Sequence, residues 1–143
     1  MRIGIDLLYL QRIEPIAQHR RFRQLVFTPA ELAEAPTDAP YRELEFLAGR
    51  LAAKEAVAKL LGCGFLRGVG WRDIQIVGTP HGGPRIRLHA RARLLAARHR
   101  IGAIAVSITH QQGCAVAVAV AGTATAQPRR RRPDGASQRR GRR

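Results

Sequence analysis

The stretch from Glu45 to Gly62 most constrains how this chain folds. It reads EFLAGRLAAKEAVAKLLG, is rich in alanine and leucine and contains no proline, so it predicts a long α-helix that begins near Tyr41. Gly62 follows the last apolar pair, where glycine commonly ends a helix. Apolar residues occur on nearly every side of the predicted helix, which indicates that it lies at the centre of the fold.

Glu55 interrupts an apolar face of this helix. It shares that face with four apolar residues, Leu44, Ala48, Leu51 and Ala58. An unpaired buried carboxylate costs several kcal/mol, so the pattern predicts a metal, a cationic partner or a raised pKa for Glu55. The alternative is a simple ion pair on the helix surface, because Lys59 follows at the favourable i, i+4 spacing.

The distribution of lysine along the chain also indicates that this helix has a special role. The chain has 25 basic residues, and only Lys54 and Lys59 are lysine. All the others are arginine. Two lysines retained within one helix indicate positions where a compact ammonium group is not interchangeable with a guanidinium group.

The charge is strongly positive and unevenly distributed. Residues 127–143 hold eight arginines and one aspartate, a charge of +7, which leaves +8 of the total +15 on residues 1–126. A basic body favours polyanionic ligands or an acidic protein partner. We expect one folded domain over residues 1–122 and a disordered, arginine-rich tail over residues 123–143. That tail would bind nucleic acid non-specifically, but no folded motif for sequence-specific recognition is present.

Several other functional classes lack a sequence signal. The apolar start of the chain is interrupted by Asp6 and no cleavage-site pattern follows, so we expect no signal peptide. No apolar segment approaches 18 residues, the length needed to span a membrane. Cys63 and Cys114 lack metal-ligand spacing. A soluble cytoplasmic protein is therefore expected.

A strand is predicted over residues 2–10. Ile3, Ile5 and Leu7 alternate onto one face, and Gly4 and Asp6 onto the other. Aspartate is disfavoured within strands, and Gly4 leaves room for close approach, so Asp6 is a candidate ligand residue. The alternative is a strand-end aspartate that caps a turn.

The remaining elements follow from turn and capping signals. Residues Arg12 to Glu14 form a short segment that Pro15 ends, and Thr28, Pro29 and Glu31 form a capping box for a helix that ends near Pro36. A glycine-rich loop over residues 62–70 is a candidate phosphate contact. We expect a hairpin of strands 71–77 and 85–88, a basic amphipathic helix over 89–100, and a second hairpin of strands 103–109 and 114–121. The second hairpin turns through residues 110–113, which places His110 beside the turn.

Taken together, these pieces resemble the holo-[acyl-carrier-protein] synthases, the small bacterial type of 4′-phosphopantetheinyl transferase. The resemblance runs from Arg2 to about Ala121. Its most specific block is residues 46–56, FLAGRLAAKEA, and it is supported by the Gly-Ile-Asp run at 4–6 and the Ser-Ile-Thr-His run at 107–110. The family fold is α+β, with a small antiparallel sheet packed on a long central helix, and the family is homotrimeric with active sites between subunits.

The resemblance implies transfer of the phosphopantetheine arm of coenzyme A to a serine of an apo acyl carrier protein, in fatty acid or polyketide biosynthesis. Adenosine 3′,5′-bisphosphate is released. By the match, Asp6 and Glu55 are the ligands of Mg²⁺, and Glu55 and Lys59 are the catalytic residues. The proton acceptor is left open between Glu55 and a water on the metal.

The match also assigns the binding residues. Arg50, Gly64 and His110 bind coenzyme A, and Arg12 and Arg21 dock the acidic carrier protein. The chain departs from the family where Gly83 replaces a common lysine, Leu25 replaces a basic residue and Gln111-Gln112 replaces a more polar or charged pair; the tail is not a family feature. There are two competing interpretations. One is a non-catalytic relative that binds the carrier protein or coenzyme A without transferring phosphopantetheine, and the other is a nucleic-acid-binding protein.

Overall fold

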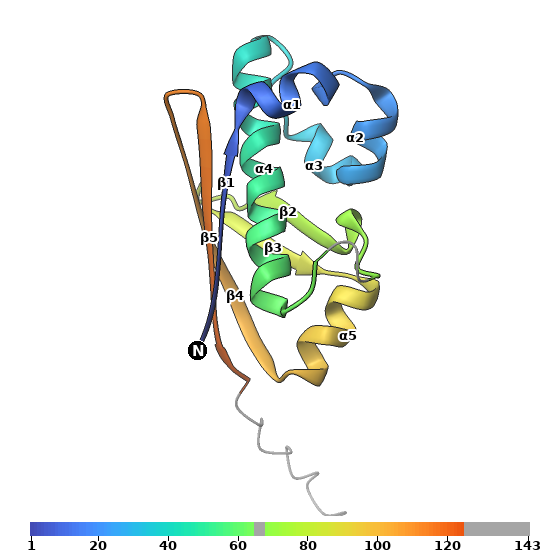
Figure 1. The fold of residues 1–143 in the computed structure, drawn as a ribbon, viewed down its shortest axis with the longest axis vertical. Helices are drawn as coiled ribbons and strands as arrows, with labels where there is room; N and C mark the ends of the chain where they lie inside the picture. The colour runs from blue at the N-terminus through green and yellow to red at the C-terminus, as the bar shows by residue number, and fades with distance from the viewer. Residues whose placement is uncertain (65–67, 125–143) are drawn as a thin grey trace, which may run out of the picture.

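The computed structural model describes residues 1–64 and 68–124, and they form an α+β fold with antiparallel sheets (Figure 1). The expected fold class is confirmed at that level. The tail and residues 65–67 of the glycine-rich loop lie outside the described residues, so the expectations for them stay predictions. None of the helices in the described ranges has both the length and the apolar character needed to cross a membrane.

Helix α4, Pro40–Leu61, is the long helix that the sequence predicts (Figure 1). It ends at Gly62, whose left-handed φ of 76° is the expected C-cap geometry. Residues on most of its circumference are buried, as the apolar pattern requires. Glu55, expected on a buried face, is half-buried, and the charged residue of this helix that is fully buried is Lys54.

One side of α4 packs on a three-stranded antiparallel sheet in the order β1-β5-β4 (Figure 1). The strands are β1, Arg2–Tyr9; β4, Ile101–Gln111; and β5, Cys114–Thr123. Gln112 and Gly113 form the whole turn, with φ values of 51° and 72° as in a type I′ hairpin. The expected four-residue connection was therefore wrong, and His110 lies within strand β4 rather than in a loop. Strand β5 also extends one residue past the expected domain boundary.

The face of β1 that packs on α4 is the one that carries Gly4, and most of the large apolar residues of the strand lie on the opposite face. Gly4 is buried against α4, while Ile3, Ile5 and Leu7 are 66%, 58% and 52% exposed. A Cβ on Gly4 would lie 1.9 Å from the carbonyl oxygen of Ala56, so only glycine allows the helix to approach this closely. The neighbouring strand β5 also turns small residues toward the core: Ala115, Ala117, Ala119 and Ala121 are buried.

Three short helices cover the N-terminal half of α4 (Figure 1): α1, Leu10–Ala17; α2, Arg20–Val26; and α3, Pro29–Ala33. The expectation that Pro15 ends a segment was wrong, because Pro15 lies inside α1. Its missing N–H affects the carbonyl of Gln11, which is exposed and accessible to water. The predicted capping box of Thr28 and Glu31 is confirmed, and α3 ends before Pro36.

The first predicted hairpin is present but begins later than expected. Trp71–Asp73 forms a 3₁₀ turn, η2, and β2 runs over Ile74–Gly78 beside β3, Pro84–Leu88. The Asp73 carboxylate accepts from the Gly70 backbone N–H at 3.2 Å, which favours the turn over a strand. Helix α5, Ala90–Arg98, follows as predicted.

Candidate functional site

Asp6, Glu55 and Lys59 lie together where β1 meets α4. The Lys59 Nζ donates to Asp6 Oδ1 at 2.8 Å and to the Ile5 carbonyl oxygen at 3.0 Å. Asp6 alternates with Ile5 along β1 and is on the same face as Gly4, toward the helix. The Lys59 side chain is nevertheless 53% exposed, so this cluster is open to solvent.

The electrostatics of Glu55 follow from this arrangement. Burial raises the pKa of the Glu55 carboxyl above its ordinary value, the nearby Asp6 carboxylate raises it further, and Lys59 opposes both. Among the ion pairs of the described residues, Lys59 bonds to Asp6 and Glu55 takes part in none. The alternative of a Glu55–Lys59 surface pair therefore does not describe this helix.

The two carboxylates have the chemistry to hold a hard divalent cation. Such ions take oxygen ligands and often use only one or two protein carboxylates, with water and phosphate supplying the rest. A cation would also relieve the repulsion that raises the Glu55 pKa. No group of three or more metal-binding side chains occurs in the described ranges, so any ion here would rely on these two and on ligand oxygens.

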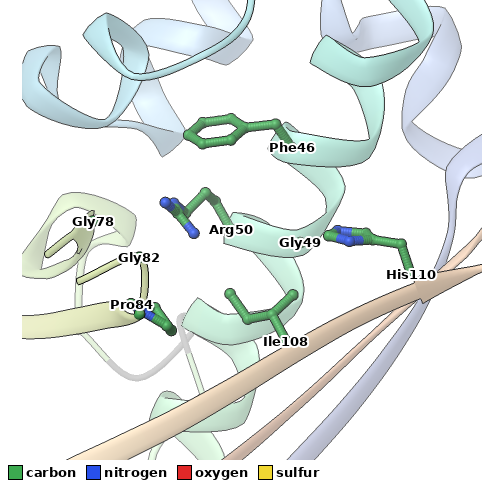
Figure 2. Close-up of a pocket in the computed structure, with 9 residues that line it drawn as sticks. Phe46, Gly49, Arg50, Gly78, Gly82, Pro84, Ile108 and His110 are labelled. Atoms are coloured by element: carbon green, nitrogen blue, oxygen red, sulfur yellow. The ribbon is translucent and has the colours of Figure 1, made fainter. Parts of the chain in front are cut away.

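A second group of predicted site residues lines a pocket of about 210 Å³ on another side of α4 (Figure 2). The helix contributes Phe46, Gly49 and Arg50. Ile108 and His110 enter from β4, and the wall opposite is the β2–β3 hairpin, with Gly78, Gly82, Gly83 and Pro84. Arg50 and His110 therefore come together, as the family resemblance implies.

Arg50 is held in a defined position. Its guanidinium carbon lies 4.5 Å from the centre of the Phe46 ring, and its Nη2 lies 3.3 Å from Glu34 Oε2. The Glu34 carboxylate is itself fixed, because both of its oxygens accept from the Gly78 N–H, at 3.0 and 2.9 Å. The Arg50 Nε is buried without a hydrogen-bond partner in the described part of the chain, which leaves it able to donate to a ligand.

Sequence reasoning missed Glu34. It follows a short helix and has no motif of its own, and its contacts to Arg50 and Gly78 span 16 and 44 residues. Only the tertiary structure brings these groups together.

Sequence reasoning also missed the role of Lys54. Its Nζ donates to Glu31 Oε2 at 2.9 Å, to the Trp71 carbonyl at 3.0 Å and to the Ile74 carbonyl. Glu31 is fully buried too, and it also accepts from the Ile76 N–H at 2.8 Å. The capping box gave a local role to Glu31 without showing that its carboxylate faces a buried ammonium.

The structure does not bring the two groups of site residues together within one chain. Asp6 pairs with Ala117 on β5, and Ala117 pairs with Ile108 on β4. Asp6 and Ile108 are therefore two strand spacings apart, roughly 10 Å between Cα atoms. The carboxylate cluster lies at the β1 edge of the sheet and the pocket at the β4 edge.

The other predicted residues lie elsewhere. Gly64 is exposed beyond the C-terminal end of α4, while the Arg50 pocket is more than two helical turns back along that helix. Arg12 on α1 and Arg21 on α2 are both exposed. Neither forms an ion pair with the site residues in the part of the chain that the structure describes.

Comparison with known proteins identifies the family. The model of the 4′-phosphopantetheinyl transferase superfamily matches residues 2–119, and the chain belongs to this family. It is 44% identical to the holo-[acyl-carrier-protein] synthase of Moorella thermoacetica, covering 82% of this chain and 91% of that protein. The synthase of Geobacillus kaustophilus is 42% identical, over 80% of this chain and 83% of its own length.

Solved structures agree with this assignment. The holo-[acyl-carrier-protein] synthase of Neisseria meningitidis superposes with a TM-score of 0.73 at 30% identity, covering 85% of this chain and 98% of that one. The Helicobacter pylori synthase in complex with coenzyme A gives 0.71 at 29% identity, covering 84% and 99%. The Bacillus anthracis synthase, also in complex with coenzyme A, gives 0.71 at 31% identity, covering 87% and 96%.

Proposed function

We propose that this protein is a holo-[acyl-carrier-protein] synthase, which transfers 4′-phosphopantetheine from coenzyme A to a serine hydroxyl of an apo acyl carrier protein. Adenosine 3′,5′-bisphosphate is the second product. The observation that carries the proposal is the Asp6–Glu55–Lys59 cluster on a fold whose relatives include coenzyme A complexes.

Asp6 and Glu55 are the residues that would hold Mg²⁺. When bound, the ion would neutralise charge on the pyrophosphate of coenzyme A, which is most of what catalysis of such a transfer requires. Asp6 keeps Oδ2 for this role while Oδ1 accepts from Lys59. A bound ion would offset the burial and the Asp6 repulsion that raise the Glu55 pKa, so Glu55 is assigned here as a ligand, and the acceptor of the serine proton is either Glu55 or a water on the metal.

Lys59, Arg50 and His110 are the groups we assign to the phosphates of coenzyme A. Lys59 offers an exposed ammonium beside the carboxylates. The free Nε of Arg50 supports an anion-binding role for the pocket, because a buried donor without a partner is costly until a ligand accepts from it. Gly64 is retained as a candidate contact in the loop that follows α4.

We further propose that the active site forms between copies of the chain in a homotrimer. The outward face of the sheet is apolar over β1 and β5: Ile3, Ile5, Leu7 and Tyr9 are each at least 50% exposed, and they pair in register with Val120, Val118, Val116 and Cys114. An exposed apolar face of this kind is typical of protein–protein interfaces. Association at this face would bring the β1-edge cluster of one copy toward the β4-edge pocket of another.

Arg12 and Arg21 are proposed as carrier-docking residues because both are exposed and acyl carrier proteins are acidic. Fatty acid or polyketide biosynthesis and a cytoplasmic location complete the proposal. The transferase domain is assigned to residues 1–122 and the arginine-rich remainder to a separate tail. Deletion of residues 127–143 is expected to leave transfer unchanged.

The test is incubation of the full chain with apo carrier protein, coenzyme A and Mg²⁺, with mass spectrometry of the carrier. We expect a mass gain of one phosphopantetheine group. Glu55→Gln should lower the turnover by about a thousandfold, while Glu45→Gln, on the same helix outside both groups of site residues, should leave it unchanged. Failure to modify any of several carriers would instead favour a relative that binds without transfer.

A further inference from the structure

Gly49 is an unusual residue for its position. It lies within the 22-residue helix α4, where glycine costs about 1 kcal/mol relative to alanine. Gly49 is buried, and its backbone has no positive φ that would demand glycine. The reason for glycine must therefore be space next to its Cα.

The imidazole of His110 occupies that space. A Cβ on Gly49 would lie 2.4 Å from His110 Nε2 and 3.0 Å from Cε1, and 3.0 Å from Ile108 Cγ2. Figure 2 shows the His110 side chain reaching from β4 to the helix beside Gly49. An alanine here would force the imidazole to move, because distances below 3.0 Å between such atoms are not tolerated.

His110 is exposed, and one edge of its ring lies against the Gly49 backbone. Its backbone is set by the pairing with Ala115, one step from the end of the hairpin. In the described parts of the chain its side chain makes no hydrogen bond or ion pair, so the space left by Gly49 is what admits the ring to this position. Arg50, the next residue on the helix, lines the same pocket.

We propose that Gly49 is a positioning residue for coenzyme A binding, which acts by admitting the His110 imidazole against helix α4 beside Arg50. This inference rests on the proposed function, since it assumes that His110 contacts coenzyme A. Gly49 itself touches no reacting group in this proposal. Its effect is on how deeply the imidazole enters the pocket.

The test is a double-mutant cycle of Gly49→Ala and His110→Ala, with kcat and the KM for coenzyme A measured for all four proteins. Gly49→Ala should raise the KM about tenfold and change kcat less than about threefold, because it displaces a binding group. In the His110→Ala background the same change should alter the KM less than about twofold, because the short contact with the imidazole is gone and only the 3.0 Å contact with Ile108 Cγ2 remains. Equal effects in both backgrounds, or no effect of Gly49→Ala alone, would overturn the proposal.

Folding is monitored by far-ultraviolet circular dichroism and thermal unfolding. If Gly49→Ala alone fails to fold, the double variant should recover the fold, and no recovery would contradict the contact. Failure of the proposed function is distinguishable, since the wild-type chain would then transfer nothing to any carrier. If the wild-type chain turns over coenzyme A and the Gly49→Ala variant has the same kcat and KM, this inference is refuted and the proposed function stands.

Discussion

The two lysines of this chain lie five residues apart on the same helix and have different surroundings. Lys54 and Lys59 each pair with a carboxylate from another element, at 2.9 and 2.8 Å. The Lys54 side chain is 0% exposed and its ammonium has three acceptors, whereas the Lys59 side chain is 53% exposed. Similar distances therefore describe two different kinds of ion pair.

The difference separates a structural role for Lys54 from the functional role that we propose for Lys59. Burial lowers the pKa of the Lys54 ammonium, and the nearby Glu31 carboxylate only partly opposes this. The charged pair therefore depends on the surrounding fold, which supplies the other hydrogen-bond acceptors of the ammonium. An exposed pair such as Lys59–Asp6 contributes about 0–1 kcal/mol to stability. Stability thus explains a lysine at position 54 but not at position 59, where the ammonium is accessible to a ligand.

The largest effect is expected at the buried pair. Lys54→Met should lower the free energy of unfolding by about 3–5 kcal/mol, because it leaves the Glu31 carboxylate buried without its cation. Adding Glu31→Gln should recover part of this loss, since an amide oxygen still accepts from the Ile76 N–H. Urea unfolding measures both, and a loss below about 1 kcal/mol for the single variant would contradict the buried-pair interpretation.

The exposed lysine should show the opposite profile. Lys59→Met should reduce the rate of phosphopantetheine transfer about a hundredfold, because it removes the charge that we assign to the phosphates of coenzyme A, yet change the free energy of unfolding by less than about 1 kcal/mol. Transfer kinetics and urea unfolding of one preparation give both values. A Lys59→Met variant that is destabilised as much as Lys54→Met and still transfers phosphopantetheine would contradict the distinction between the two lysines.

Arginine substitutions sharpen the comparison while keeping the charge. Lys54→Arg should cost about 1–3 kcal/mol of stability, since a larger planar group must enter a closely packed site. Lys59→Arg should stay within about 0.5 kcal/mol of the wild-type value, as expected at an exposed position. Thermal and urea unfolding of the two variants, measured side by side, give both losses of stability. Similar losses for Lys54→Arg and Lys59→Arg would contradict the difference between a buried and an exposed lysine.

A smaller effect than at Lys54 is expected at a pair of intermediate exposure, Arg23–Glu43, with side chains 25% and 11% exposed. Burial alone would raise the pKa of Glu43, but hydrogen bonds from Arg23 and Gln18 bring it below its ordinary value of 4.5. A depressed carboxyl pKa adds stability above the unfolded-state value, and this is lost as the pH falls through the folded-state value.

Glu43→Gln should therefore lower the free energy of unfolding at pH 7 by about 1 kcal/mol. The difference from the wild-type chain should begin to shrink as the pH falls below about 4.5, where Glu43 becomes protonated in the unfolded state, and it should level off below the lower folded-state pKa. Urea unfolding at several pH values checks this. A difference that stays constant across that range would assign the loss to packing rather than to charge.

The features predictable from sequence are those set by local geometry. The long helix, its Gly62 cap and the Thr28 capping box follow from residues within a few positions of one another, and all are present. The side of β1 that faces the core was less clear, because alternation distinguishes two faces without saying which is buried. Gly4 was the relevant signal, since it alone allows contact with α4.

The candidate site was found mainly through the family resemblance. Periodicity identified Glu55 as unusual but suggested the wrong ion-pair alternative, because i, i+4 spacing says nothing of an aspartate 53 residues away. The contact of Glu34 with Arg50 and that of Gly49 with His110 depend on how separate elements pack. Such contacts have no signal in a single sequence.

Strand β5 alternates alanine toward the helix with valine toward solvent, and this alternation has a consequence for how the chain finds its pairing. Both faces of the strand are apolar, so polarity cannot distinguish the native register from one shifted by a single residue. Size can. In a shifted register Val116, Val118 and Val120 would face α4, whose backbone nearly touches the sheet at Gly4. Each added methyl group would be overpacked there, so a mispaired hairpin could not bind the helix and would separate and pair again.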